Sequence, residues 1–258
     1  MPNLSDAENE LSVEDILEEI DQIDTDKIKI RPETLKYFET VTAYIKCFDE
    51  LEALYNEMDP SRKLADYDMP DIHLPVQQLS MSGEPVKNLV ELYEVAEEML
   101  PMFKAKIENL MGGMDTSRVC AASADAHFKL PPGENKLKGK RRASEKAKDN
   151  YSKSEPGPPE SWLYDIVRGS ILFDTADQMI ELLVRIREDE TIEIIKSKNR
   201  FCNPTLSGYR DWNLKLEIST NDGNIKHICE LQLHLEAIKE ADERLGSHSH
   251  YEFFRKSI

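Results

Sequence analysis

The sequence predicts an α/β fold of the α+β kind: a mixed β-sheet flanked by helices and preceded by an acidic, all-helical N-terminal region. Two observations support this fold class. Apolar residues recur at helical spacing through much of residues 1–115, whereas residues 116–258 hold short apolar runs, helical segments and a strong hairpin signal. We therefore expect two domains, with a boundary near residue 115.

The N-terminal region contains two long amphipathic patterns. One runs from Pro32 to about Met58, and the other from Pro85 to about Met111. Pro101 is expected to kink or divide the second helix, because proline removes a backbone donor from the helix interior. A capping-box pattern at Ser12 predicts a shorter helix before them. The region shows no catalytic constellation.

The net charge of −17 belongs to the first part of the chain. Residues 1–100 hold 25 acidic and 8 basic side chains, so the rest of the chain balances to zero. Such acidity argues against a nucleic-acid surface there. The sequence leaves three roles open for these helices: a layer packed on the sheet, a contact in an oligomer, or a phosphate mimic that covers a basic cleft.

The sequence predicts a cytoplasmic protein without a membrane segment. No apolar run approaches the length that spans a bilayer, and the N-terminus lacks a basic start followed by an apolar stretch. The four cysteines lie far apart and without metal-ligand spacing, so we expect free thiols.

The charge reverses at residues 136–148, a lysine- and arginine-rich segment of good helix formers. Lys140, Ser144 and Lys148 are four residues apart, which places them on one stripe of a helix. This stripe is either a solvated helix face or a clamp for a polyphosphate, since ammonium and hydroxyl groups bind phosphate oxygens. The chain has no glycine-rich phosphate loop.

The run Trp162–Phe173 predicts a buried strand, yet it contains Asp165 and Arg168. Charges in so apolar a run are costly unless they are paired or bound to a metal. The elements expected to follow are a helix over 174–186, a strand over 190–196 and a final segment over 237–254 that is helical at first.

A hairpin is predicted around Asn221-Asp-Gly-Asn224, because both central turn residues must accept positive φ. If Asn221 faces Asn224, the register of both strands follows, and one face is apolar while the other is polar. The apolar pairs are Trp212–Leu233, Leu214–Leu231 and Leu216–Cys229. The polar pairs are Asp211–His234, Asn213–Gln232 and Lys215–Glu230.

The order of basic helix, Asp-bearing strand, helix, strand and glutamate-bearing hairpin resembles the RelA/SpoT family of nucleotide pyrophosphokinases over roughly residues 136–255. The resemblance implies a nucleotidyltransferase-like fold. It also implies Mg²⁺-dependent transfer of pyrophosphate from ATP to the 3′-hydroxyl of a guanine or other purine nucleotide, as in (p)ppGpp synthesis. Nothing resembles the family's hydrolase module, so the expected activity is that of a synthetase alone.

Five motifs carry the resemblance, and four of them imply a role. The basic helix with Lys138, Lys140, Ser144 and Lys148 resembles the helix that grips the ATP phosphates. Tyr164-Asp-Ile166 resembles the start of the metal-binding strand, which makes Asp165 a Mg²⁺ ligand. Glu230-Leu-Gln232 resembles a Glu-x-Gln strand, in which Glu230 completes the metal site and activates the acceptor hydroxyl, with Gln232 beside it. Gly208-Tyr209-Arg210 resembles a segment whose tyrosine stacks on the acceptor base, and Gly246 and His250-Tyr251 resemble the motif that follows.

The departures from the family pattern fall on the nucleotide-contacting face. Ser170 stands where an arginine is usual, and Arg168, two residues earlier, is expected to contact the donor phosphates. Asp211, Asn213 and His234 replace a serine, a histidine and an arginine. We predict that Asp211 and His234 form one compensating pair. Together with Tyr209 and Arg210, Asn213 and His234 are assigned to acceptor binding.

Two alternatives to synthesis of a guanosine alarmone stay open. One keeps the donor chemistry but modifies another hydroxyl, such as the 3′ end of tRNA, and the altered acceptor face motivates it. The other is a nucleotide-binding regulatory module that has lost catalysis. The two carboxylates Asp165 and Glu230 count against such a loss, and Ser170 counts for it.

Overall fold

The computed structural model of the chain describes residues 32–58, 62–67, 69, 73–112, 114, 128–129, 137–153, 155–205, 207–220 and 223–246. Within these residues, none of the helices combines the length and the apolar character needed to cross a membrane. The predicted helix at Ser12 and the motif at His250-Tyr251 lie outside the described residues.

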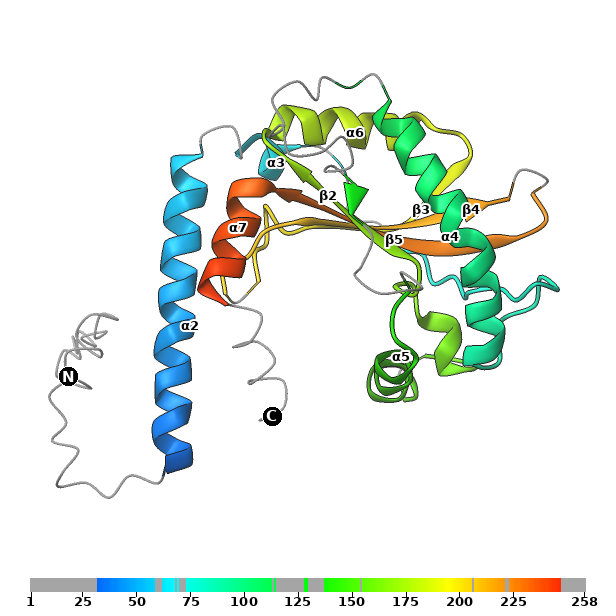
Figure 1. The fold of residues 1–258 in the computed structure, drawn as a ribbon, viewed down its shortest axis with the longest axis horizontal. Coiled ribbons are helices and arrows are strands. Elements are labelled where there is room, and N and C mark those ends of the chain that lie inside the picture. The colour runs from blue at the N-terminus through cyan, green and yellow to red at the C-terminus, as the bar shows by residue number, and fades with distance from the viewer. Residues whose placement is uncertain are drawn as a thin grey trace, which may run out of the picture.

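A five-stranded sheet runs through the centre of the molecule (Figure 1). Its strand order is β1-β2-β5-β4-β3, in which β2 and β5 are parallel and the other neighbours are antiparallel. The predicted mixed sheet is thus confirmed. The strands are β1 (Phe128–Lys129), β2 (Arg168–Phe173), β3 (Ile192–Asn199), β4 (Trp212–Ser219) and β5 (Lys226–Leu235).

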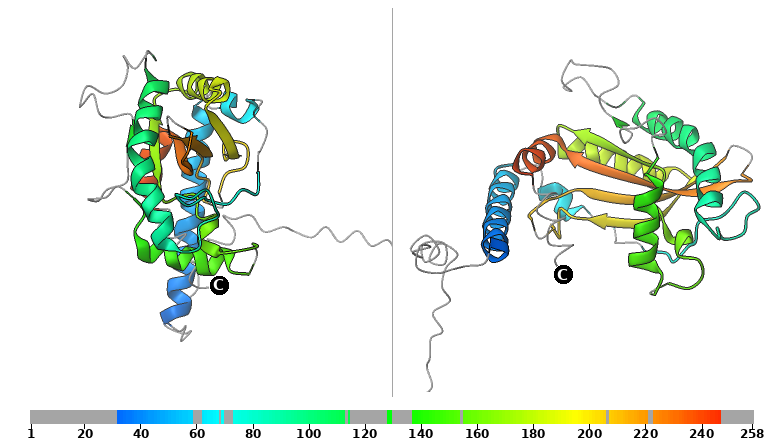
Figure 2. Two further views of the ribbon diagram at one scale, coloured as in Figure 1. Left: turned by 90° about the vertical axis from the view of Figure 1, so that its right-hand side faces the viewer. Right: turned by 60° about the horizontal axis from the view of Figure 1, so that its bottom comes forward.

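Helices flank the sheet, as predicted. Figures 1 and 2 show α4 and α6 on one side of it, α5 near the start of β2, and α2 beside α7 at the far end. The helices are α2 (Pro32–Glu57), α3 (Arg62–Asp66), α4 (Leu89–Met111), α5 (Lys140–Lys146), α6 (Ala176–Glu188) and α7 (Glu236–Leu245). A π-helical turn (Ala147–Tyr151) extends α5, and a 3-10 helix (Pro159–Trp162) precedes β2.

The hairpin has the predicted register. Lys215 lies opposite Glu230 and Asn213 opposite Gln232 on the polar face. Gly223 adopts a φ of 71°, the left-handed conformation that favours glycine in such a turn. Asn221 and Asp222 lie outside the described residues. A pattern of alternating polar and apolar residues joined to one turn signal was therefore sufficient to fix the pairing.

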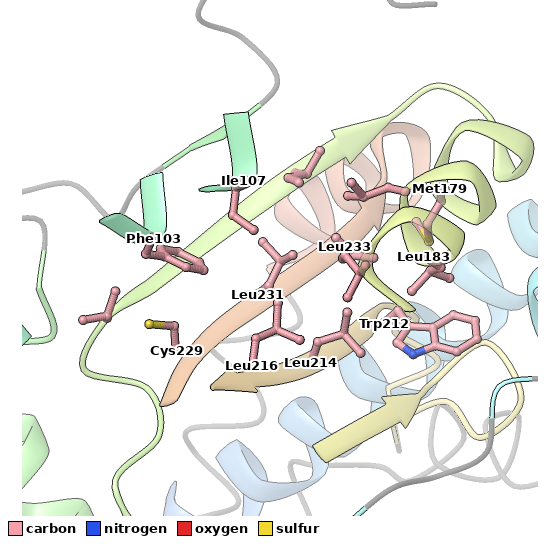
Figure 3. Packing of buried hydrophobic residues seen from close by; sticks show 14 of the residues in the cluster. Phe103, Ile107, Met179, Leu183, Trp212, Leu214, Leu216, Cys229, Leu231 and Leu233 are labelled. Atoms are coloured by element: carbon pink, nitrogen blue, oxygen red, sulfur yellow. The ribbon is translucent and has the colours of Figure 1, made fainter. Parts of the chain in front are cut away.

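The hydrophobic core lies between the apolar face of the hairpin strands and the helices above it. Figure 3 shows Phe103 and Ile107 of α4 and Met179 of α6 in one cluster with Trp212 and Leu231 of the sheet. All five side chains are buried. Because α4 and the sheet share this cluster, α4 is part of the core of the sheet. The boundary near residue 115 stays a prediction.

The strand predicted over Trp162–Phe173 is wrong in its first half, because β2 begins only at Arg168. Residues 163–167 form a buried loop before it. The carbonyl of Ile166 in this loop accepts a hydrogen bond from the amide of Lys138 at 3.0 Å. The backbone at Lys138, which is distant in the sequence, thus takes the place of a strand partner for this loop. The local sequence pattern does not reveal such a contact.

Helix α4 begins later than predicted and is not divided. Asn88 caps it, with its side-chain oxygen accepting from the amides of Val90 and Glu91. An asparagine cap satisfies amide groups that the first turn leaves without partners. Pro101 lies within the helix, which continues through it to Met111.

The structure predicts acid-sensitive stability through His227. This side chain is fully buried in β5, and neither ring nitrogen has a partner among the described residues. Burial lowers its pKa from the ordinary 6.5 to about 3. The unfolded chain therefore takes up a proton that the folded chain refuses, so stability should fall as the pH drops from about 6.5 toward 3.

The variant His227→Leu tests this expectation. Below pH 6, the unfolding free energy of the wild type should fall by about 1.4 kcal/mol per pH unit through the protonation of His227 in the unfolded chain. The variant lacks this histidine and should not show this part of the fall. Urea unfolding of both proteins at pH 7 and pH 5 gives the comparison. An unchanged pH slope in the variant would contradict the assignment.

Candidate active site

The polar face of the sheet carries the predicted site residues on three adjacent strands. Glu230 of β5 lies between Arg168 of β2 and Lys215 of β4, its Cα partners on either side. Gln232 lies in the same way between Ser170 and Asn213. Paired residues point to the same face of a sheet. These side chains therefore project together, away from the core.

Asp165 comes from the loop before β2 and is 6% exposed. Its Oδ2 accepts from Nζ of Lys138 at 2.5 Å and from Nζ of Lys146 at 2.8 Å. Burial by itself would raise the pKa of Asp165, but the two ammonium groups hold it well below the usual range. Its Oδ1 is buried and has no hydrogen-bond partner among the described residues. The carboxylate thus keeps one oxygen for a further ligand.

Glu230 is 7% exposed and charged. Its Oε2 forms an ion pair with Lys215, and its Oε1 accepts from the side-chain amide of Gln232 at 3.0 Å. Burial would raise its pKa, yet the lysine charge outweighs this effect and the pKa lies below its usual value. The negative charge of Asp165 acts on Glu230 in the opposite direction, toward a higher pKa. The structure therefore brings the two predicted metal ligands into one electrostatic site.

The predicted stripe on the basic helix is exposed. Lys140, Ser144 and Lys148 all lie at the surface, on α5 and the π-helical turn that follows it. The buried side of this helix is formed by Ala143 and Ala147. The stripe is therefore free to meet a ligand without rearrangement of the core.

Arg168 presents a buried donor at this site. Its Nε has no hydrogen-bond partner among the described residues. Burial raises the pKa of Tyr93 to about 12 and lowers the pKa of Lys138. On both groups the charge of Arg168 acts toward a lower pKa and the charge of Asp165 toward a higher one. An unpartnered buried donor and an unpartnered buried acceptor, Asp165 Oδ1, are costly unless a ligand satisfies them.

Tyr209 and His234 form a second cluster on this face. The Tyr209 hydroxyl and His234 Nδ1 are 2.6 Å apart. The predicted pair of Asp211 with His234 is wrong: Asp211 Oδ1 instead accepts from Arg200 at 2.5 Å. The register places the two residues side by side. Asp211 nevertheless pairs with Arg200, and His234 bonds to Tyr209.

Arg210 is not brought to the carboxylates. It is 5% exposed, donates to Glu52 of α2 at 2.8 Å and lies over the ring of Tyr55 at 3.9 Å. Its neighbours along the chain face the polar side of the sheet, whereas Arg210 faces α2. Its predicted contact with the acceptor stays a prediction.

Sequence reasoning missed two of the three lysines that pair with the carboxylates. Lys215 was placed opposite Glu230 by register, but its ion pair was not inferred. Lys146 belonged to the basic run without a role of its own. Its place one residue before Ala147, a small residue that is buried here, was the available signal for an inward position.

A hollow among the described residues lies elsewhere. It has a volume of about 790 Å³, between α4 and the turn ends of β3 and β4. Lys106, Glu193, Glu217 and Lys226 contribute to its lining. It contains none of the predicted site residues. Nor do the described residues gather three or more His, Cys, Asp or Glu side chains suited to one metal ion.

No protein-family model matches the chain, and no curated protein matches its sequence. Among solved structures, the chain is similar to small alarmone synthetase 2 from Bacillus subtilis, with 17% identity and a TM-score of 0.45 over 62% of this chain and 79% of that one. It is similar to a GTP pyrophosphokinase family protein from Streptococcus pneumoniae, with 14% identity and a TM-score of 0.46 over 66% and 90% of the two chains. A third similar structure is small alarmone synthetase 1 from Bacillus subtilis bound to its product pppGpp, with 14% identity and a TM-score of 0.44 over 63% and 91%.

Proposed function

We propose that this protein transfers pyrophosphate from ATP to a hydroxyl group of a purine nucleotide, with GDP or GTP as the expected acceptor. One observation carries the proposal. Two buried carboxylates, Asp165 and Glu230, lie among cationic side chains, with one free acceptor oxygen and one free donor, Arg168 Nε, buried beside them. A metal-bound polyphosphate offers what both atoms lack, namely a cation for the oxygen and an anion for the donor.

The residues fit Mg²⁺. Asp165 Oδ1 has no other partner among the described residues, and Mg²⁺ in nucleotide sites takes one or two carboxylates together with phosphate oxygens. Asp165 and Glu230 would hold the ion. When bound, Mg²⁺ supplies charge neutralisation and alignment of the phosphates.

The chain's own residues account for the proton and the orientation. The acceptor oxygen attacks the β-phosphorus of ATP, the bond from that phosphorus to the α–β bridging oxygen breaks, and AMP leaves. Glu230 accepts the hydroxyl proton, since its lowered pKa keeps it ionised. Gln232 orients that carboxylate through its 3.0 Å hydrogen bond. Transfer of this kind requires positioning and electrostatic stabilisation more than covalent catalysis.

The exposed stripe of Lys140, Ser144 and Lys148 is assigned to the donor phosphates. Lys140→Ala and Lys148→Ala should each raise the KM for ATP several-fold. The effect should shrink as salt rises, because exposed charges are screened. Steady-state kinetics at two ionic strengths measure it, with Lys104→Ala on α4 as an exposed control. If neither variant nor their combination alters the KM for ATP, the stripe does not bind the donor.

Tyr209 is assigned to the acceptor base. Stacking of a base on an aromatic ring is worth about 1–3 kcal/mol, so Tyr209→Ala should raise the acceptor KM by roughly 5- to 150-fold and leave the KM for ATP unchanged. Tyr209→Phe keeps the ring and loses only the bond to His234, and it should retain most of the affinity. A lower melting temperature with an unchanged acceptor KM would show instead that the ring serves packing.

The proposed reaction is tested by incubating the protein with γ-labelled ATP, Mg²⁺ and one acceptor at a time: GDP, GTP, ADP, AMP or tRNA. Pyrophosphate transfer gives a labelled acceptor together with AMP, whereas transfer of one phosphate gives ADP. Label on tRNA alone would select the second acceptor class. Binding of ATP without any labelled product would select a regulatory module.

A further inference from the structure

Both candidate metal ligands are already neutralised by lysines. Asp165 receives Lys138 and Lys146 on the same oxygen, and Glu230 receives Lys215. The Lys215 and Glu230 side chains are only 11% and 9% exposed, so solvent screens this pair little. Such lysines are unnecessary for holding a metal, because they compete with it for the same carboxylates.

The surroundings are also cationic beyond these pairs. Arg168 is the Cα partner of Glu230. Burial lowers the pKa of Lys196, and the nearby charges of Lys215 and Lys146 lower it further. A free divalent cation would enter against the charges of these side chains. A polyphosphate, by contrast, is attracted by them, and it brings oxygen ligands of its own.

We propose that Lys146 and Lys215 close the two carboxylates to a free divalent cation, so that the metal enters only together with a polyphosphate. The phosphate oxygens would draw the two ammonium groups away, and the cation would then be held by Asp165 Oδ1, which has no partner among the described residues, and by Glu230 Oε2, which Lys215 releases. The inference rests on the proposed function in one respect: it takes Asp165 and Glu230 as the metal ligands.

Lys146 differs from Lys138 in a way that suits this exchange. Lys138 is 10% exposed at its side chain, and its amide and carbonyl are tied to Ile166 and Tyr93. Lys146 is 27% exposed and lies where α5 passes into the π-helical turn. Its long, flexible stem can swing the ammonium from Asp165 to a phosphate without moving the backbone.

Equilibrium dialysis of the full chain against Mn²⁺ tests the proposal, with and without a non-hydrolysable ATP analogue. Wild-type protein should retain Mn²⁺ only when the analogue is present. The double variant Lys146→Met and Lys215→Met should bind Mn²⁺ alone at least tenfold more tightly than wild type. Mn²⁺ alone should also raise the melting temperature of this variant, but not that of the wild type.

Lys153→Met is the matched control. It removes the same charge from an exposed position just beyond the π-helical turn, and none of the ion pairs found between described residues joins Lys153 to either carboxylate. It should behave as wild type.

Retention of Mn²⁺ by the wild type without the analogue, as tightly as with it, would overturn the proposal and needs no variant. So would a folded double variant that gains no Mn²⁺ binding, or a wild type that retains no Mn²⁺ even with the analogue. The dialysis is independent of turnover. A protein that retains Mn²⁺ with the analogue but labels no acceptor would therefore refute the proposed reaction and leave this inference standing.

Discussion

Replacing Glu230 with glutamine should reduce the rate of pyrophosphate transfer about a thousandfold while the protein stays folded. Glutamine preserves the shape of the side chain and the backbone pairing in the middle of β5. In the proposed reaction, it removes the negative charge that would hold the metal and the oxygen that would accept the hydroxyl proton. A loss of about 4 kcal/mol of transition-state stabilisation corresponds to that factor.

The control for this variant is Glu217→Gln. Glu217 is likewise a buried carboxylate on this sheet, paired with Lys226 at 2.6 Å, yet it has no part in the site. Its replacement should change turnover less than twofold. Single-turnover assays compare both variants with the wild type, and circular dichroism confirms their folding. Near-normal turnover by Glu230→Gln would remove Glu230 from the catalytic site.

Asp165→Asn should show a similar loss of rate, accompanied by lower stability. The buried ammonium group of Lys138 and the partly exposed one of Lys146 lose their carboxylate in this variant. Breaking a buried ion pair from one side costs roughly 3 kcal/mol of unfolding free energy, although Lys146 can relax toward solvent. The two substitutions differ in the number of ammonium groups that lose their carboxylate: two, of Lys138 and Lys146, in Asp165→Asn and one, of Lys215, in Glu230→Gln.

The hairpin could be predicted because its information is local. One glycine-containing turn and the alternation of Trp212, Leu214 and Leu216 with polar residues leave a single register that buries the apolar side. That register placed Lys215, Glu230 and Gln232 together on the polar face, where the structure has them. The polar half of the candidate site therefore followed from pairing alone.

The contacts of Asp165 could not be predicted in the same way. Its partners lie 27 and 19 residues away along the chain, and the loop that carries it is held by the backbone of Lys138. The residues around Asp165 form an apolar run, and such a run predicts a strand. Arg210 is a similar case, since its partner Glu52 is 158 residues away. Long-range ion pairs leave no periodic signal in the sequence. They fix where these side chains lie, but the local sequence does not reveal them.

The second large effect is expected from removing the N-terminal region. A fragment that begins at residue 117 should fail to fold. Five side chains of α4 that are fully buried in the core would be lost, namely Leu92, Val95, Met99, Phe103 and Ile107. At about 1.5–3 kcal/mol for each buried apolar side chain, their loss approaches the entire stability of a typical domain, roughly 5–15 kcal/mol.

Two point variants make the same case without truncation. Phe103→Ala should lower the unfolding free energy by about 3–5 kcal/mol, because it leaves a cavity between α4 and the sheet. Val90→Ala, on the same helix but 65% exposed, should change it by less than about 0.5 kcal/mol. Denaturant unfolding measures both.

The fragment that begins at residue 117 decides between packing and autoinhibition by the acidic region. If residues 117–258 were soluble, bound ATP more tightly than the full chain and lost that gain when residues 1–115 were added at low salt, the acidic helices would cover the basic cleft. An insoluble fragment would show that α4 is needed to complete the hydrophobic core between the sheet and the helices.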